Sequence, residues 1–159
     1  KKRIVCACST AVSALNVGGQ TIHSLFQIQP RDFIMPEFLK LMAKPRNILS
    51  ATDVLIIDEI SIVRADLLDA VDMTLRKYRR NSHPFGGVQL LMIGDAQQLS
   101  PVVKDHEKRY LAQVYPSPYF FHSKALQNLP YITIELQKVH RQKVYCIHRL
   151  LQFWQDKHA

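Results

Sequence analysis

Residues 54–63 read V-L-I-I-D-E-I-S-I-V, and this stretch decides the fold. It begins with four apolar residues, Val54 to Ile57, without polar alternation. A short run of this kind predicts a strand that is buried on both faces, as in a parallel sheet. The run ends in two adjacent carboxylates, Asp58 and Glu59. Open parallel sheets bind ligands at the carboxyl ends of their strands, so this acidic pair marks a candidate site.

The acidic pair has two interpretations. As a polar strand end it carries solvated charges, which is the commoner case for a lone Asp–Glu pair. As a Walker B pair, Asp58 holds the Mg²⁺ of a bound nucleotide through water, and Glu59 orients or deprotonates the attacking water. Phosphoryl transfer needs both functions, because its catalysis consists mostly of positioning and charge neutralisation.

A second, mostly apolar strand is predicted at 88–93, and a polar loop, G-D-A-Q-Q-L-S-P at 94–101, follows it. Asp95 and Gln98 therefore follow a buried strand in the same way as the acidic pair. A glutamine in this position can contact a terminal phosphate and also hold the attacking water.

Strands alternate with helices along the chain, which predicts an α/β fold with a mostly parallel sheet flanked by helices. The clearest helix is 64–80, where Asp66, Asp69 and Asp72 come early and basic residues come late, an order that complements the helix dipole. The other expected elements are strands at 4–8 and 131–136 and helices at 11–16, 105–115, 123–129 and 144–156.

Composition narrows the class of protein. The 159 residues have the length of one domain, and no run reaches the ~18 apolar residues of a membrane helix. Three cysteines do not form a disulfide framework, and a reducing cytoplasmic setting fits them better. The net charge of +8 predicts a polyanionic partner, nucleic acid first. The chain lacks an initiating Met, and we expect it to be a piece of a longer protein.

Thr10 and Thr21 are hydroxyl residues placed where strands give way to helices, which is a natural position for phosphate contacts. His23 lies near Phe26 and could stack on a base. The alternative is that Thr10 only caps a helix and that His23 is a partly buried histidine with its own partners. On local grounds this alternative is favoured.

Four blocks of the chain resemble the RecD-like and Pif-family DNA helicases, the 5′-to-3′ branch of superfamily 1. Residues 10–26, T-A-V-S-A-L-N-V-G-G-Q-T-I-H-S-L-F, are similar to the first DNA-binding motif of that family. Residues 54–69 resemble motif II, and residues 86–102, G-G-V-Q-L-L-M-I-G-D-A-Q-Q-L-S-P-V, resemble motif III. Residues 135–142, E-L-Q-K-V-H-R-Q, resemble motif IV, where the family has an arginine. The blocks follow the family's order and span most of the chain.

The resemblance implies a RecA-like (P-loop NTPase) core, truncated at its N-terminus, that uses ATP and Mg²⁺. It implies that Asp58 serves Mg²⁺ and that Asp95 also belongs to the nucleotide site. Glu59 would serve the attacking water. Gln98 would contact the γ-phosphate, and Arg141 would stabilise the charge that develops on it. The residues that would line a path for single-stranded DNA are Thr10, Asn16, Thr21 and His23.

The resemblance also implies what the chain lacks. The Walker A loop, G-x-x-x-x-G-K-[ST], and the second RecA-like domain are absent from the sequence. We therefore expect residues 1–159 to be a partial motor domain, with a small insertion at 27–53 and a helix at 143–159 that leads to the second domain. The function expected is that of a fragment of an ATP-dependent helicase that translocates on single-stranded DNA.

Two alternatives remain. One is a nucleic-acid-binding α/β domain that hydrolyses nothing. The other is a metal-dependent nuclease that uses Asp58, Glu59 and Asp95, although a two-metal site needs carboxylates that converge on shared ions.

Overall fold

The protein folds around a sheet of four parallel strands in the order β2-β1-β3-β4. The computed structural model describes residues 2–29, 47–95, 97–127 and 129–137. The strands are β1 (Ile4–Cys8), β2 (Gln20–Thr21), β3 (Val54–Asp58) and β4 (Gln89–Met92). Three of the four were predicted from apolar runs. β2 was missed, because a two-residue strand leaves no periodic signal.

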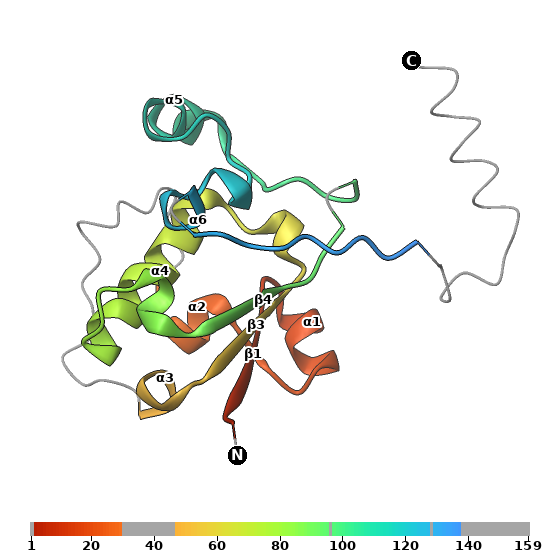
Figure 1. The fold of residues 1–159 in the computed structure, drawn as a ribbon. Helices are drawn as coiled ribbons and strands as arrows, with labels where there is room; N and C mark the ends of the chain where they lie inside the picture. Colours follow the sequence, from red (N-terminus) through yellow and green to blue (C-terminus); the bar gives the residue numbers. More distant parts are fainter. Residues whose placement is uncertain (1, 30–46, 96, 128, 138–159) are drawn as a thin grey trace, which may run out of the picture.

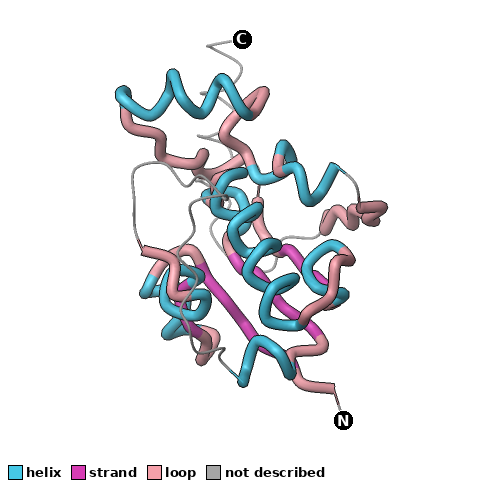
Figure 2. Tube along the Cα trace, turned by 90° about the vertical axis from the view of Figure 1, so that its left-hand side faces the viewer, coloured by secondary structure: helices cyan, strands magenta, loops and turns pink. Residues whose placement is uncertain are grey.

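Helices lie on both faces of this sheet (Figure 1). α1 (Ala11–Asn16) covers one face beside β1 and β2, whereas α2 (Ile22–Phe26), α3 (Asn47–Ala51) and α4 (Ala65–Arg79) cover the other. Figure 2 shows the α4 side, where the helices lie in front of the strands. The mostly parallel, helix-flanked sheet expected from the sequence is confirmed.

The core lies between β3 and α4. Leu55 and Ile57 of β3 are buried and pack in one cluster with Leu68, Val71 and Leu75 of α4. The alternate β3 residues, at positions 54 and 56, are only half-buried. The prediction that β3 is buried on both faces is therefore wrong for the described residues, because α1 is the only helix on the second face and it lies over the β1–β2 end.

The remaining elements are two helices that follow β4 and three single-turn helices, two of which precede β4. They are α5 (Asp105–Val114), α6 (Lys124–Gln127) and the single-turn helices Ile60–Ile62, Pro84–Gly87 and Phe120–His122. Leu111 and Tyr115 form a second, smaller core with Ala65, which attaches α5 to the start of α4.

The predicted strand at 131–136 is wrong: Tyr131 to Leu136 form no strand in the structure. Its alternating apolar side chains, Ile132, Ile134 and Leu136, are exposed. A strand needs a neighbouring backbone to pair with, and β4 at the sheet edge pairs only with β3 among the described residues.

Two predicted segments lie wholly or mostly outside the described residues. The helix at 143–159 and most of the insertion at 27–53 lie outside the described residues. Within the described part, no helix is long and apolar enough to cross a bilayer.

Candidate functional site

The acidic pair lies at the carboxyl end of β3, in a turn with an unusual backbone. Glu59 has φ 56° and ψ 45°, the left-handed conformation that residues other than glycine seldom adopt. Its backbone N–H donates to Asp58 Oδ1 at 3.0 Å. Within the described residues, no hydrogen bond or ion pair engages the Glu59 carboxylate. Backbone strain of this kind costs about 1–3 kcal/mol and is concentrated at functional sites.

The backbone of the next strand holds this turn in place. Ile93 N–H donates to Ile57 O at 2.9 Å, and Ile60 N–H donates to Ile93 O at 2.9 Å. Gly94 packs so closely on the turn that an added Cβ would lie 3.0 Å from Ile60 N and 3.1 Å from Ser61 N. The loops that follow β3 and β4 are therefore in direct contact.

Asp95 organises the loop after β4. Its carboxylate accepts hydrogen bonds from Gln97 N–H at 2.9 Å and from Gln98 Nε2 at 3.0 Å. The Gln98 side chain is thus oriented from within its own loop. Asp58, Glu59, Asp95 and Gln98 all follow the carboxyl ends of two neighbouring parallel strands. Arg141 lies outside the described residues, so the structure does not place it.

Of the four predicted DNA-contacting residues, Thr21 ends β2 and Thr10 comes shortly after β1, while Asn16 ends α1 and His23 belongs to α2. The register pairs Cys8 with Thr21, which brings the ends of β1 and β2 side by side. Thr10 accepts from Ser13 N–H at 3.1 Å, so it caps α1, as the local interpretation proposed. Thr21 caps α2 in the same way, through Ser24 N–H at 3.2 Å. Asn16, at the other end of α1 from Thr10, is exposed, and His23 in α2 is half-buried.

The surroundings of His23 favour its neutral form. Burial lowers the pKa of its imidazole, and the positive charge of Arg64 lowers it further, while Asp66 opposes them. A neutral imidazole presents an uncharged ring to a stacking partner at neutral pH.

The sequence profile of the PIF1-like helicases matches residues 1–150. The chain belongs to this family. It is 38% identical over 146 residues to the ATP-dependent DNA helicase PIF1 of Saccharomyces cerevisiae (strain YJM789), which covers 90% of the chain and 16% of that protein. It is 35% identical over 150 residues to the PIF1 of Homo sapiens, which covers 93% of the chain and 22% of that protein. The chain thus spans less than a quarter of these relatives.

Solved structures of PIF1-like helicases share the fold. The structure titled Pif1 helicase from Bacteroides in complex with ADP-AlF3 and ssDNA is 36% identical and superposes with a TM-score of 0.88. It covers all of this chain, which matches 38% of its length. Bacteroides Pif1 bound to ssDNA is 38% identical, with a TM-score of 0.85, and covers 95% of the chain. These likenesses show that the sheet of this chain is a RecA-like core.

Asp58 and Glu59 could hold a magnesium ion only together with ligands from outside the described residues, such as phosphates and waters. Among the described residues, no group of three or more His, Cys, Asp or Glu side chains could hold a metal by itself. Mg²⁺ is commonly bound by one or two carboxylates, with phosphates and waters as its other ligands. Asp58 suits that arrangement. The nuclease alternative loses support, because the Asp95 carboxylate is already engaged by Gln97 and Gln98.

Sequence reasoning missed the ion-pair network that ties the site to α5. Arg64 Nη1 lies 2.7 Å from Glu107 Oε1, and Arg64 Nη2 lies 2.6 Å from Asp66 Oδ2. Glu107 also accepts from Lys104 N–H at 2.9 Å, which caps α5. The only signal available was an arginine just after the acidic stretch, and its partner Glu107 lies 43 positions away.

Proposed function

We propose that this chain is the core of the first RecA-like motor domain of an ATP-dependent DNA helicase, and that it couples ATP hydrolysis to movement along single-stranded DNA. The observation that carries the proposal is the Glu59 carboxylate. It has no partner within the described residues and sits in a strained turn that Gly94, at the start of the loop carrying Gln98, packs against. The names of the relatives, ATP-dependent DNA helicases, support the same activity.

Each side chain at this edge then has a role. Asp58 would hold Mg²⁺ through water, and the cation would supply positive charge to neutralise the phosphates. Glu59 orients the attacking water and accepts its proton. Gln98, fixed by Asp95, contacts the γ-phosphate, and Arg141 stabilises the charge that develops there.

The DNA path is assigned to Thr10, Asn16, Thr21 and His23. Their hydroxyl and amide groups contact phosphates, and the neutral His23 ring stacks on a base. The Walker A loop and the second RecA-like domain belong, in this proposal, to other parts of the same protein. We also place the protein in a reducing compartment such as the cytoplasm, since Cys6 and Cys8 are free thiols.

The test is a substitution of Glu59 in the full natural protein that carries this chain. Glu59→Gln keeps the shape of the side chain but removes its capacity to accept a proton. ATPase activity stimulated by single-stranded DNA should fall by about 10²- to 10⁴-fold, the contribution of a positioned general base. ATP binding should be retained. Asp105→Asn, a change in an exposed acid on α5, is the control and should leave turnover unchanged.

Full ATPase activity in Glu59→Gln would remove the motor assignment. If ATPase is absent from the unmodified protein while single-stranded DNA still binds, the non-hydrolysing binding domain is the correct function.

A further inference from the structure

An exposed aromatic stack precedes α6, in the turn Phe120–His122. The rings of Tyr119 and Phe121 are parallel, with centroids 5.3 Å apart and an interplanar angle of 7°. Phe120 meets Phe121 edge-on, and the His122 ring lies 4.8 Å from it. Phe121 is nevertheless 40% exposed. A partly exposed aromatic ring within a cluster of rings forms an apolar surface patch, and such a patch suggests a ligand with an apolar face.

The stack is fixed in position before any ligand binds. Tyr119 forms a backbone bridge with Arg64, and Ala65 N–H donates to Pro118 O at 2.9 Å. Ser117 Oγ is hydrogen-bonded to His122 Nδ1. The Arg64 side chain is in turn held by Asp66 and Glu107. A ring that is already immobilised loses little conformational entropy when a partner stacks on it.

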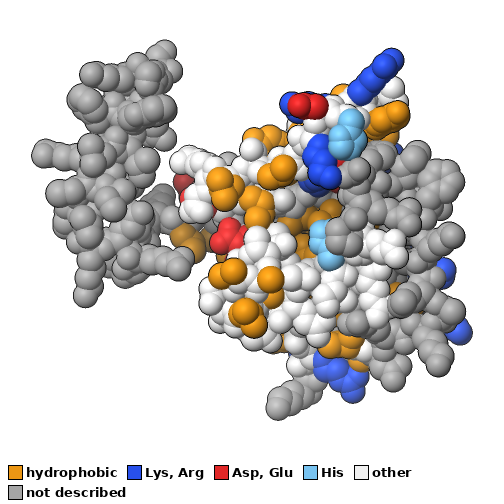
Figure 3. All heavy atoms as spheres, turned by 180° about the vertical axis from the view of Figure 1, so that it is seen from behind, with side chains coloured by type: hydrophobic (Ala, Val, Ile, Leu, Met, Phe, Trp, Pro, Cys, Tyr) orange, Lys and Arg blue, Asp and Glu red, His pale blue; other side chains and the backbone are white. Residues whose placement is uncertain are grey.

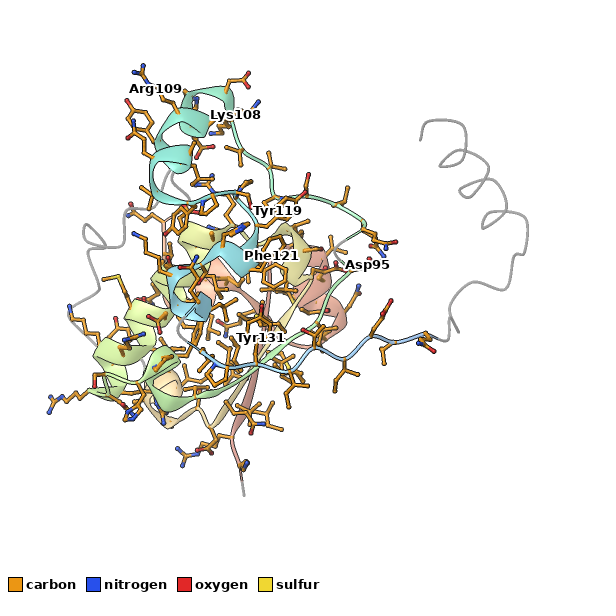
Figure 4. All side chains as sticks on the ribbon, turned by 45° about the horizontal axis from the view of Figure 1, so that its top comes forward. Asp95, Lys108, Arg109, Tyr119, Phe121 and Tyr131 are labelled. Atoms are coloured by element: carbon orange, nitrogen blue, oxygen red, sulfur yellow. The ribbon has the colours of Figure 1, made fainter. Side chains whose placement is uncertain are left out.

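The stack is continuous with the predicted DNA path. Arg64 lies close enough to His23 for its charge to lower the pKa of the His23 imidazole, and the same arginine is bridged to Tyr119. The turn Phe120–His122 also contacts the turn Ile60–Ile62 that follows Glu59. Figure 4 shows Tyr119 and Phe121 side by side below α5. Arg64 therefore links His23 to Tyr119, and Phe121 stacks on Tyr119.

Basic side chains lie beyond Tyr119. A cavity of about 410 Å³ adjoins the stack, with mostly apolar walls from the loop after β4, from α5 and from residues 115–119. Tyr119 and Lys108 both line it, and exposed Lys108 is paired with Asp105 at 2.7 Å. Arg109 lies beside Lys108 on α5 (Figure 4). Lys, Arg and His side chains gather at this end of the molecule in the opposite view (Figure 3).

We propose that Phe121, backed by Tyr119, is a base-stacking platform that extends the single-stranded DNA path beyond His23. The proposal rests on the DNA-binding function proposed above. Aromatic rings next to basic side chains are the usual surface for single strands, because every base has a π-face and every linkage has a phosphate. The net charge of +8 favours a polyanion over an apolar protein partner, and the aromatic stack favours a polyanion that carries flat bases.

The experiment uses the full natural protein and the octanucleotide dT8, together with eight versions of dT8 that each carry one abasic site. The strand is short, which limits sliding. Phe121→Leu should bind dT8 about tenfold more weakly, since stacking contributes about that factor per base. In the unmodified protein one abasic position should cost a similar factor, and in Phe121→Leu this cost should vanish at that position alone. Phe121→Trp should restore both effects.

Two further variants separate the possible outcomes. Tyr110→Leu, a change in an exposed aromatic residue on α5, is the matched control and should bind dT8 normally. His23→Ala tests the DNA path itself. If His23→Ala weakens binding while Phe121→Leu leaves both the affinity and the abasic pattern unchanged, the platform is refuted and the proposed function stands. If the unmodified protein does not bind dT8, both proposals fall.

Discussion

The acids after β3 and the acids of α4 are close in sequence and opposite in environment. Glu59 stands in a strained turn, and its carboxylate has no partner within the described residues. Asp66, Asp69 and Asp72 are buried in α4. Asp69 alone accepts hydrogen bonds from Tyr115 OH at 2.7 Å and Ser123 Oγ at 2.6 Å. A carboxylate without an internal partner is available to a ligand, whereas a buried one with a full set of donors holds the fold together.

Asp69 and Asp72 connect α4 to segments later in the chain. Asp69 also accepts from the backbone N–H groups of Lys124 and Ala125, at 3.2 and 3.0 Å, and so caps α6. Asp72 pairs with Arg76 at 2.8 Å and accepts from Phe85 N–H. Removing an acid of this group leaves several buried donors unsatisfied, which removing Glu59 does not.

The largest effect is expected at Asp69. Asp69→Ala should lower the free energy of unfolding by about 3–5 kcal/mol, because four donors, three of them in buried hydrogen bonds, lose their acceptor. Glu59→Gln should change it by less than about 0.5 kcal/mol, as for a substitution away from buried contacts. Urea denaturation of both variants measures the difference. Equal stability of Asp69→Ala and the unmodified protein would show that water replaces the carboxylate and that the contrast between the two acid groups is wrong.

The sequence predicted one side of this contrast better than the other. Apolar periodicity located β3 and α4, and resemblance pointed to Glu59 and Gln98 as site candidates. The inward orientation of Asp69 was not predictable, because its partners Tyr115 and Ser123 lie 46 and 54 positions away. The dipole argument for the early α4 acids described their order correctly and said nothing of their burial.

Contacts between distant segments also explain where the predicted and observed elements differ. β2 and α3 have two and five residues, too few for a period to show. The alternation at 131–136 has the period of a strand, but a strand forms only where a second backbone offers its hydrogen bonds.

Gly94 and Gly86 provide a matched pair of substitutions, one beside the acidic turn and one beside α4, with effects of intermediate size. A Cβ on Gly94 would meet the turn after Glu59, at 3.0 Å from Ile60 N. A Cβ on Gly86 would meet Leu75 O of α4 at 2.8 Å, and Gly86 also has φ 62°. Each change to Ala should lower the free energy of unfolding by about 1–3 kcal/mol through overpacking.

The two variants should differ in function. Gly94→Ala displaces the acidic turn, so ATPase activity of the full natural protein should fall well beyond what its lost stability explains. Gly86→Ala should keep normal turnover at temperatures where it is folded. Thermal melts and turnover on the same samples separate the two effects. If both variants lose activity in proportion to stability, the contact between Gly94 and the acidic turn has no functional role.

The smallest expected effect is a pH dependence at His23. Burial, and next the charge of Arg64, lower the pKa of this imidazole below its ordinary value of 6.5. The folded state therefore prefers the neutral ring. The stabilisation that the neutral ring gives the folded state is fully present above pH 6.5. It is lost as the pH falls from there through the lowered pKa, because the unfolded chain binds the proton more tightly.

The melting temperature should thus fall between pH 7.5 and 5.5, and His23→Gln should make that fall shallower. His106→Gln on α5 controls for the loss of one imidazole. An unchanged slope in His23→Gln would mean that Arg64 and the burial of His23 do not act on the ring as the structure indicates.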